Sequence, residues 1–372
     1  MLGIFVGRRR SIMSWENKVR KTVPYTAGEQ PKDKNIIKLN TNECPYPPAP
    51  GVRKAIEELH ARYDSLRLYP DMDASELVDA LADFYGTDSS RIFVGVGSDD
   101  VLALCFLTFF CGGDPILFPA ITYSFYPVWA DLFRIPYKAV PLTEDMTIDA
   151  FEYMPRLTKV KNGGIIFPNP NAPTGVEEPL SKIEKIVRAN PDSVVIVDEA
   201  YIDFGGSSAL PLTEKYDNLL VVQTFSKSRS MAGLRVGFAM GNEKLIGYLK
   251  DVKFSFNSYT MNLPSIRLGR AAVEDREYFA ETTGKIVKTR ERFKEKLKEM
   301  GFVFPDSKAN FVFARHPGFS GEYLFKELRK RNIVVRHWNT PAIREYLRIT
   351  IGTDMQMDAV ADALMEIIKT KE

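Results

Sequence analysis

Short apolar runs separated by polar loops and helical patterns organise the first two thirds of the chain. Six runs of strand length lie at residues 91–95, 115–118, 164–167, 193–197, 219–223 and 236–240. Apolar residues at helical spacing, or in one longer buried run, mark helices over 51–62, 74–85, 101–110 and 180–187. Because strand, loop, helix and strand recur in this order, the pattern predicts an α/β fold with a mostly parallel sheet between helices.

The pattern changes after residue 263. Residues 264–300 are charged and helical and predict one long helix over about 280–300. Strands at 309–313, 333–335 and 346–351 and helices at 323–332 and 357–369 predict a separate α+β unit. The proline-dense segment 40–50 predicts an extended arm. We expect a disordered extension at 1–13, an N-terminal arm at 14–44 joined to the small domain, a large domain at 45–264 and a small domain at 265–372.

Composition narrows the class of protein. The chain has 372 residues, of which 45% are hydrophobic and 26% charged, and its net charge is +2. These values are ordinary for about two globular domains and predict neither a nucleic-acid nor a membrane partner. The longest apolar run, residues 101–111, is too short to span a bilayer. The chain start lacks the order of a secretory signal, and Met13 is an alternative start. Three cysteines (Cys44, Cys105, Cys111) do not suggest a disulfide framework, and a reducing cytoplasm fits.

One lysine stands on a Ser/Gly-rich loop between two of the predicted strands. The loop runs from Thr224 through Lys227 to Gly237. An ammonium held near a sheet end is costly to desolvate, so its pKa falls and a free amine becomes available to form a Schiff base. Thr224, Ser226 and Ser228 suit close approach of a phosphate, and Arg235 offers its counter-charge. The alternative is a solvated Lys/Arg pair on a polar loop.

Three apolar strands lead to polar residues that we expect to meet. They end near Asn171, Asp198 and Lys227, and ligands of open α/β sheets bind beyond the carboxyl ends of such strands. The turn containing Gly95 and Gly97 precedes a helix whose first N–H groups suit an anion. It is not the dinucleotide fingerprint, since Asp100 occupies the third glycine position. Asp198 alone could merely cap a turn; together these features predict a site for a carbonyl cofactor with a phosphate and a ring nitrogen.

On these residues the chain resembles the fold-type I pyridoxal-phosphate (PLP) aminotransferases, and within them most resembles the histidinol-phosphate aminotransferase family. The resemblance covers about residues 39–365. It is carried by Leu39-Asn-Thr-Asn-Glu43, Tyr69-Pro70, Gly97-Ser-Asp-Asp100, Pro170-Asn-Ala-Pro-Thr-Gly175, Asp198-Glu-Ala-Tyr201, Thr224-Phe-Ser-Lys227, Gly233-Leu-Arg235-Val-Gly-Phe238 and Leu347-Arg348-Ile-Thr-Ile-Gly352.

The resemblance implies a role for each residue around the PLP ring. Lys227 bonds covalently to PLP and later moves the substrate proton, and Asp198 pairs with the ring nitrogen. Asn171 and Tyr201 hydrogen-bond the ring oxygen, and Tyr123 stacks on the ring. The chain reads Asn-Ala-Pro where many relatives have Asn-Asn-Pro. The ring contact therefore falls on Asn171, with Asn169 as the lesser alternative.

The resemblance also implies a phosphate site and a substrate anchor. The cofactor phosphate sits on the backbone N–H groups of Ser98 and Asp99 and is enclosed by Thr224, Ser226 and Arg235. Tyr69 reaches the same phosphate from the neighbouring subunit, so the implied assembly is a homodimer. Arg348 anchors the anionic end of the substrate, with Arg336 close by; surface ion pairing is the alternative role for both arginines.

The implied reaction is transamination between L-histidinol phosphate and 2-oxoglutarate, giving imidazole acetol phosphate and L-glutamate in histidine biosynthesis. PLP is the expected cofactor, and no metal is expected. Aromatic amino acid aminotransferases share nearly all of the motifs, and threonine-phosphate decarboxylase is also similar. A non-catalytic PLP-binding regulator is the remaining alternative. Only about 40 residues precede the catalytic region, without a helix-turn-helix pattern that such a regulator would carry.

Overall fold

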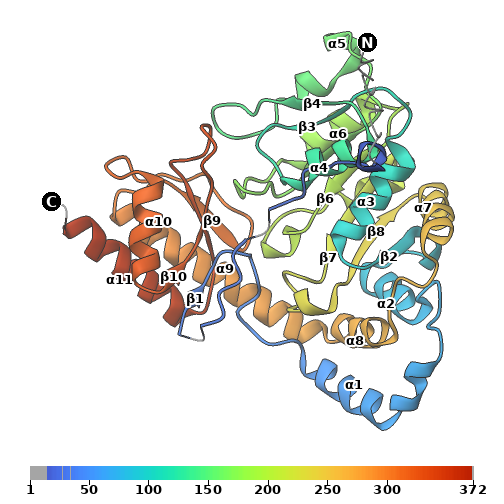
Figure 1. The fold of residues 1–372 in the computed structure, drawn as a ribbon, viewed down its shortest axis with the longest axis horizontal. Helices are drawn as coiled ribbons and strands as arrows, with labels where there is room; N and C mark the ends of the chain where they lie inside the picture. Colours follow the sequence, from blue (N-terminus) through green and yellow to red (C-terminus); the bar gives the residue numbers. More distant parts are fainter. Residues whose placement is uncertain (1–14, 27, 34, 371–372) are drawn as a thin grey trace, which may run out of the picture.

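A computed structural model describes residues 15–26, 28–33 and 35–370 of the chain. The extension predicted at 1–13 lies outside these residues. Figure 1 shows a larger part built around one sheet and a smaller part, coloured orange and red, that holds the C-terminal helix. Among the helices of the described ranges, none is long and apolar enough to cross a bilayer.

The larger part is built on a seven-stranded sheet that confirms the predicted mostly parallel arrangement. Strands β3 to β7 run parallel to their sheet neighbours where they pair with one another, whereas β8 is antiparallel to both β2 and β7. The order across the sheet is β2 (Ile92–Gly95), β8 (Gly237–Gly241), β7 (Leu219–Thr224), β6 (Val195–Asp198), β5 (Ile165–Pro168), β3 (Ile116–Pro119) and β4 (Tyr137–Val140).

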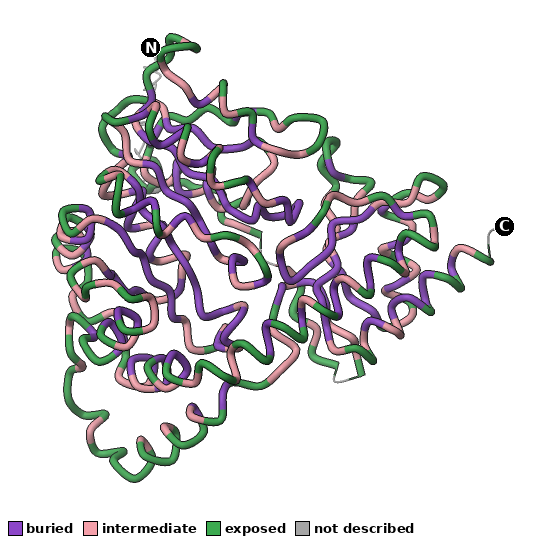
Figure 2. The backbone as a smooth tube through the Cα atoms, turned by 180° about the vertical axis from the view of Figure 1, so that it is seen from behind, coloured by how far each residue is buried: buried purple, intermediate pink, exposed green. Residues whose placement is uncertain are grey.

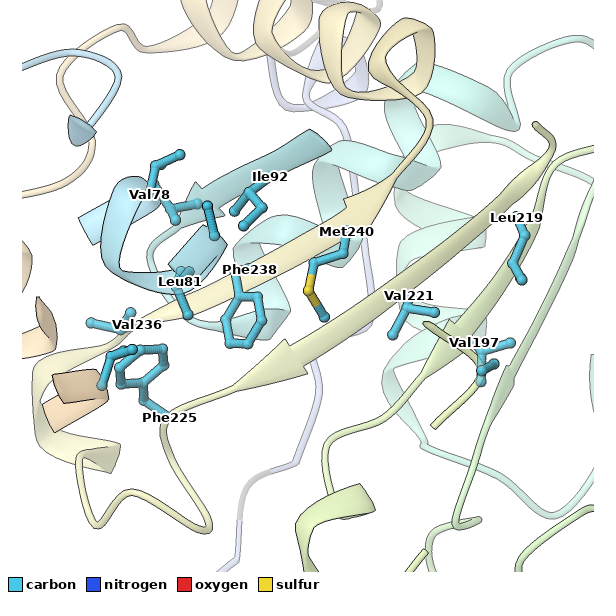
Figure 3. Close-up of a cluster of buried hydrophobic side chains, with 14 of the residues drawn as sticks. Val78, Leu81, Ile92, Val197, Leu219, Val221, Phe225, Val236, Phe238 and Met240 are labelled. Atoms are coloured by element: carbon cyan, nitrogen blue, oxygen red, sulfur yellow. The ribbon is translucent and has the colours of Figure 1, made fainter. Parts of the chain in front are cut away.

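Helices cover both faces of this sheet, which explains why its strands read as continuous apolar runs. Val195 and Val197 of β6 belong to the cluster that includes residues of α2 (Ser75–Tyr85), α6 (Leu180–Ala189) and α8 (Leu263–Glu274). Ile196, between them, belongs to the opposite cluster, with residues of α3 (Ser98–Phe109), α4 (Phe125–Phe133) and α7 (Glu243–Phe256). Figure 3 shows part of the first cluster, where Phe238 of β8 lies near Leu81 of α2.

The smaller part is an α+β unit that includes the N-terminal arm. Its three-stranded sheet has the order β11 (Arg336–His337), β12 (Leu347–Thr350) and β9 (Phe311–Ala314), and it packs with α9 (Arg276–Glu299), α10 (Gly321–Lys330) and α11 (Asp354–Lys369). Strand β1 (Ile37–Lys38) of the arm pairs in parallel with β10 (Ile333–Val334). Figure 1 accordingly shows the blue arm running through the orange and red part.

Several elements differ from the prediction. Helix α3 begins at Ser98, three residues before the predicted start. Helix α9 begins at Arg276 rather than at 280, and the separate helix α8 precedes it. Helices α4 and α7 and strands β4 and β11 were not predicted. Three of the four residues of the edge strand β4 are exposed, so its sequence lacks a long apolar run.

The domain boundary at residues 264/265 stays a prediction. Helix α8 spans it and packs against α2 and against α1 (Pro50–Ala61), both in the larger part. In Figure 2, buried backbone follows the strands of the large sheet, whereas much of the segment around α1 is exposed.

Candidate active site

Lys227 follows the carboxyl end of β7 and points toward the N-terminal arm. Its Nζ donates a hydrogen bond to the Thr41 carbonyl oxygen at 3.0 Å and lies 6.0 Å from the centre of the Tyr201 ring. Burial and the Arg348 guanidinium lower the pKa of Lys227 to about 8, against the opposing effect of the Asp99 carboxylate. A measurable fraction of the lysine is therefore a free amine near neutral pH.

This lowered pKa predicts that Lys227 destabilises the PLP-free protein. Its ordinary value is 10.5, so below about pH 8 the folded chain must hold an ammonium group partly out of water. Replacing Lys227 with methionine should raise the free energy of unfolding at pH 7 by about 1–3 kcal/mol. The gain should shrink as the pH rises from about 8 toward 10.5, because the folded lysine is then neutral. Urea unfolding of both proteins at pH 7 and pH 9.5 measures it, and an equal gain at both values would contradict the assignment.

Asp198, the last residue of β6, is a buried carboxylate with two neutral hydrogen-bond donors. The side chain is 4% exposed, and it accepts from the Tyr126 hydroxyl at 2.9 Å and from the Ala200 N–H at 3.3 Å. Burial raises the pKa of Asp198 to about 6, although both hydrogen bonds favour the charged form. Within the described ranges Asp198 has no ion-pair partner, and a buried carboxylate of this kind fits a cationic ring N–H.

Asn171 lies in the loop after β5 and retains an unused polar atom. Its Nδ2 donates to the Ile121 carbonyl oxygen at 3.1 Å and to Thr174 Oγ1 at 3.0 Å, but its buried Oδ1 has no partner in the described part of the chain. The alternative, Asn169, instead exchanges two hydrogen bonds with the Glu178 backbone, at 2.7 and 3.3 Å. Asn171 is therefore the asparagine of this loop with a group left for a ligand.

Tyr201 is held by the arm, through a contact that the sequence did not reveal. Its hydroxyl accepts from Asn42 Nδ2 at 2.9 Å. The Thr350 hydroxyl of β12 donates to Asn42 Oδ1 at 3.0 Å and accepts from the Asn42 N–H at 3.1 Å. In the sequence, Asn42 is only one residue of the motif at 39–43. It joins the arm, the large sheet and the small sheet at the site.

Two glycines, Gly97 and Gly237, allow close packing where α3 begins, next to Arg235. A Cβ atom on Gly97, whose φ is +85°, would lie 2.4 Å from Arg235 Nη2, and one on Gly237 would lie 2.2 Å from the Ser98 nitrogen. Only glycine allows this approach. The N–H groups of the first helical turn and the Arg235 guanidinium are thus placed where they could bind an anion.

The remaining residues of the predicted phosphate site are linked by hydrogen bonds. Arg235 donates to Ser226 Oγ at 3.3 Å, and Thr224 Oγ1 donates to the same atom at 3.1 Å. Arg235 also pairs with the Asp99 carboxylate at 3.3 Å, and the Tyr123 hydroxyl donates to that carboxylate at 2.8 Å. Burial and this carboxylate raise the pKa of Tyr123. The sequence predicts a role for the backbone N–H of Asp99 alone, and the structure adds its carboxylate.

Arg336 and Arg348 are cross-strand neighbours on the small sheet. Their Cα atoms are directly paired between β11 and β12. Arg348 is half-buried and donates to the Asn40 carbonyl oxygen at 2.9 Å, while its Nε has no partner in the described residues. Arg336 donates to the Thr26 carbonyl oxygen at 3.4 Å. Over the described ranges neither guanidinium forms an ion pair, so two uncompensated cations remain for an anionic ligand.

Tyr69 is the one predicted site residue that this chain does not bring to the others. It is 82% exposed, and its ring stacks on Tyr259 at 4.6 Å between centres. Across the described part of the chain, no group of three or more His, Cys, Asp or Glu side chains is placed to hold a metal ion.

The unpartnered Oδ1 acceptor of Asn171, the buried Asp198 carboxylate and the glycine-lined start of α3 fit PLP. They offer, in turn, a hydrogen bond to the ring, a counter-charge for its nitrogen and a seat for its phosphate. Lys227 would supply an amine for the PLP aldehyde.

Comparison with known proteins identifies the family. The family model for class I and II aminotransferases matches residues 34–364. Histidinol-phosphate aminotransferase of Lactococcus lactis subsp. cremoris (strain SK11) is 50% identical over 360 residues, covering 97% of this chain and 99% of that protein. The enzyme of the same name from Brachyspira hyodysenteriae is 51% identical over 354 residues, covering 95% of this chain and 98% of that protein.

Solved structures confirm the fold class. Histidinol-phosphate aminotransferase from Sinorhizobium meliloti, in complex with pyridoxal-5'-phosphate, superposes with a TM-score of 0.81 at 24% identity, covering 91% of this chain and 92% of that one. The enzyme from Clostridium acetobutylicum gives the same TM-score and identity over 90% of this chain and 100% of that chain. The chain therefore belongs to the class I and II aminotransferase family, and its relatives at about 50% identity are histidinol-phosphate aminotransferases.

Proposed function

We propose that this protein is a PLP-dependent aminotransferase that converts L-histidinol phosphate and 2-oxoglutarate into imidazole acetol phosphate and L-glutamate, in histidine biosynthesis. The observation that carries the proposal is the uncompensated pair Arg336 and Arg348, of which Arg348 is close enough for its charge to lower the pKa of Lys227. Such a pair suits a substrate with a strongly anionic end. Names of relatives at about 50% identity over nearly the full chain support the same substrate.

We assign one task to each group of the cofactor site. Asp198 would face the PLP ring nitrogen. Asn171 and Tyr201 would contact the ring oxygen, and Tyr123 would stack on the face of the ring. The phosphate would lie at the start of α3, with Ser98, Asp99, Thr224, Ser226 and Arg235. When bound, PLP supplies an electron sink for the bond that breaks at the substrate Cα.

Lys227 acts as the general base on the substrate. Its lowered pKa, about 8, lets the neutral amine accept the Cα proton at physiological pH and return it later in the reaction. The Thr41 carbonyl, which accepts a hydrogen bond from Nζ, orients the amine while the lysine is not bonded to the cofactor.

Arg336 and Arg348 would bind the anionic ends of both substrates in turn. Guanidinium groups bind phosphate and carboxylate through paired hydrogen bonds, so one pair can accept the phosphate of L-histidinol phosphate and the distal carboxylate of 2-oxoglutarate. The reaction would then proceed in two half-reactions at a single site.

The assembly we propose is a homodimer in which Tyr69 reaches the phosphate site of the partner. Tyr69 is exposed, and so are the apolar side chains near it in sequence, Tyr63, Leu66 and Leu68, as well as its stacking partner Tyr259. An exposed apolar group of this kind is typical of an interface with another chain. We also propose a cytoplasmic location, in keeping with three free cysteines.

Single-turnover spectroscopy of the PLP enzyme tests the substrate. L-histidinol phosphate, phenylalanine and threonine phosphate are each mixed with the enzyme, and the change in cofactor absorbance is followed. We expect L-histidinol phosphate to react at least about tenfold faster than phenylalanine, because phenylalanine has no phosphate for the two arginines to bind. Faster reaction with phenylalanine would indicate an aromatic aminotransferase, and release of carbon dioxide from threonine phosphate would indicate the decarboxylase.

A further inference from the structure

One face of the small sheet carries both arginines and a row of aromatic rings. Arg336 is paired with Arg348 across β11 and β12, and Arg348 is paired with Phe313 across β12 and β9. Trp338 follows Arg336 by two residues, so it extends the same face. The guanidinium carbon of each arginine lies 5.3 Å from the centre of the Trp338 ring, and that of Arg348 lies equally far from the Phe311 ring.

The two guanidinium groups lie close together although both are positively charged, so a favourable contact must offset their repulsion. Like charges directly opposite on neighbouring strands repel each other, and within the described ranges no carboxylate pairs with either arginine. The negative face of an aromatic ring attracts a cation without carrying a net charge. A carboxylate in the same place would also hold the arginines, but it would compete with the anionic substrate. An indole does not.

The Trp338 ring is itself held by aromatic neighbours. It meets Phe313 edge to face, at 6.5 Å between centres and 68° between planes. Phe313 in turn stacks on Tyr346 at 4.5 Å and 7°. Since Phe313 lies on β9 and Trp338 just beyond β11, this contact fixes the indole across the face on which Arg348 lies.

We propose that Trp338 is a positioning residue that holds Arg336 and Arg348 side by side for the anionic group of each substrate. The inference rests on the proposed function, which assigns these two arginines to the substrate anion. It places the effect of Trp338 on anion binding in both half-reactions, and not on PLP binding or on proton transfer by Lys227.

Variants of the holoenzyme that differ in the aromatic face test this role. Trp338→Leu and Trp338→Met remove the ring, Trp338→Phe keeps a smaller one, and Trp15→Leu removes a tryptophan that is 72% exposed. The probes are the KM values for L-histidinol phosphate and 2-oxoglutarate and competitive inhibition by inorganic phosphate. Melting temperature, PLP dissociation and kcat are measured alongside.

We expect the ring-free variants to raise both KM values about tenfold and to bind inorganic phosphate about tenfold more weakly. Their kcat should stay within about twofold of the parent, and their PLP dissociation should be unchanged. Trp338→Phe should recover most of the loss, and Trp15→Leu should match the parent. The inference is overturned if the ring-free variants bind inorganic phosphate as the parent does, if Trp338→Phe is as impaired as Trp338→Leu, or if PLP binding weakens in proportion.

Arg336→Ala and Arg348→Ala separate this inference from the proposed function. If both variants lose L-histidinol phosphate binding but the ring-free variants do not, only the role of Trp338 fails. If neither arginine variant changes KM or phosphate inhibition, the arginines do not bind the substrate anion, and the proposed anchor fails as well. Loss of substrate binding in all of these variants, with PLP retained, supports both.

Discussion

Replacing Lys227 with alanine is expected to lower kcat by at least about 10⁴-fold while leaving the chain folded. General base catalysis alone contributes about 10²–10⁴-fold, and this lysine also supplies the amine that bonds to PLP. The variant should still take up PLP through the phosphate site and Asp198, but the absorbance of the bound cofactor should shift because the covalent bond is lost. Single-turnover absorbance with L-histidinol phosphate measures both effects.

Two controls make this result specific. Lys253 is buried, and its Nζ donates to the backbone carbonyls of Met72 and Val94, away from the site. Lys253→Met should change stability and leave kcat within a few-fold. Added small primary amines should restore part of the turnover of Lys227→Ala, because they can accept the Cα proton in the vacated space. Turnover by Lys227→Ala close to that of the parent would remove Lys227 from the reaction.

The convergence of Lys227, Asp198 and Asn171 could be predicted because it depends only on strand ends. Their strands are apolar runs that are recognisable in the sequence, and parallel neighbours place their carboxyl ends along one edge. The glycines around Ser98 were informative for a similar reason, since a tight strand-to-helix turn leaves helix N–H groups free.

The polar contacts that complete the site could not be predicted in this way. Asn42 contacts Tyr201 and Thr350, and the Thr41 carbonyl contacts Lys227, across 159, 308 and 186 residues of sequence. Such contacts depend on where an irregular arm passes between two parts of the fold. The spacing of apolar residues in the sequence does not indicate that path. The arm could be predicted as extended from its prolines, but its position beside the active-site lysine could not.

Aromatic residues were hard to assign for a different reason. In the sequence, Tyr126 and Trp338 look like ordinary aromatic core residues. A single aromatic residue does not indicate which side chain it will contact. Only the structure shows that the Tyr126 hydroxyl lies 2.9 Å from the buried Asp198 carboxylate. In the same way, only the structure shows that two guanidinium groups lie beside the Trp338 ring.

Replacing Asp198 with asparagine is expected to lower kcat by about 10²–10³-fold. The amide keeps the shape of the side chain but carries no charge, and losing one partner of a buried ion pair costs about 3–5 kcal/mol. In the PLP-free protein, burial raises the pKa of Asp198 to about 6 from its ordinary 3.8, so holding the carboxylate charged at pH 7 disfavours the folded state. A cationic ring nitrogen removes that penalty. PLP should therefore bind the parent far more tightly than it binds Asp198→Asn.

Tyr126→Phe should give a smaller effect of the same kind. It removes one hydrogen bond to the Asp198 carboxylate and leaves the Ala200 N–H, so we expect kcat and PLP affinity to fall by about tenfold. Because the lost donor favours the charged carboxylate, the acid limb of the pH profile should move to higher pH. A Tyr126→Phe variant with lower kcat but an unmoved pH profile would make this contact purely structural. An Asp198→Asn variant within fivefold of the parent would mean that the carboxylate does not face the ring nitrogen.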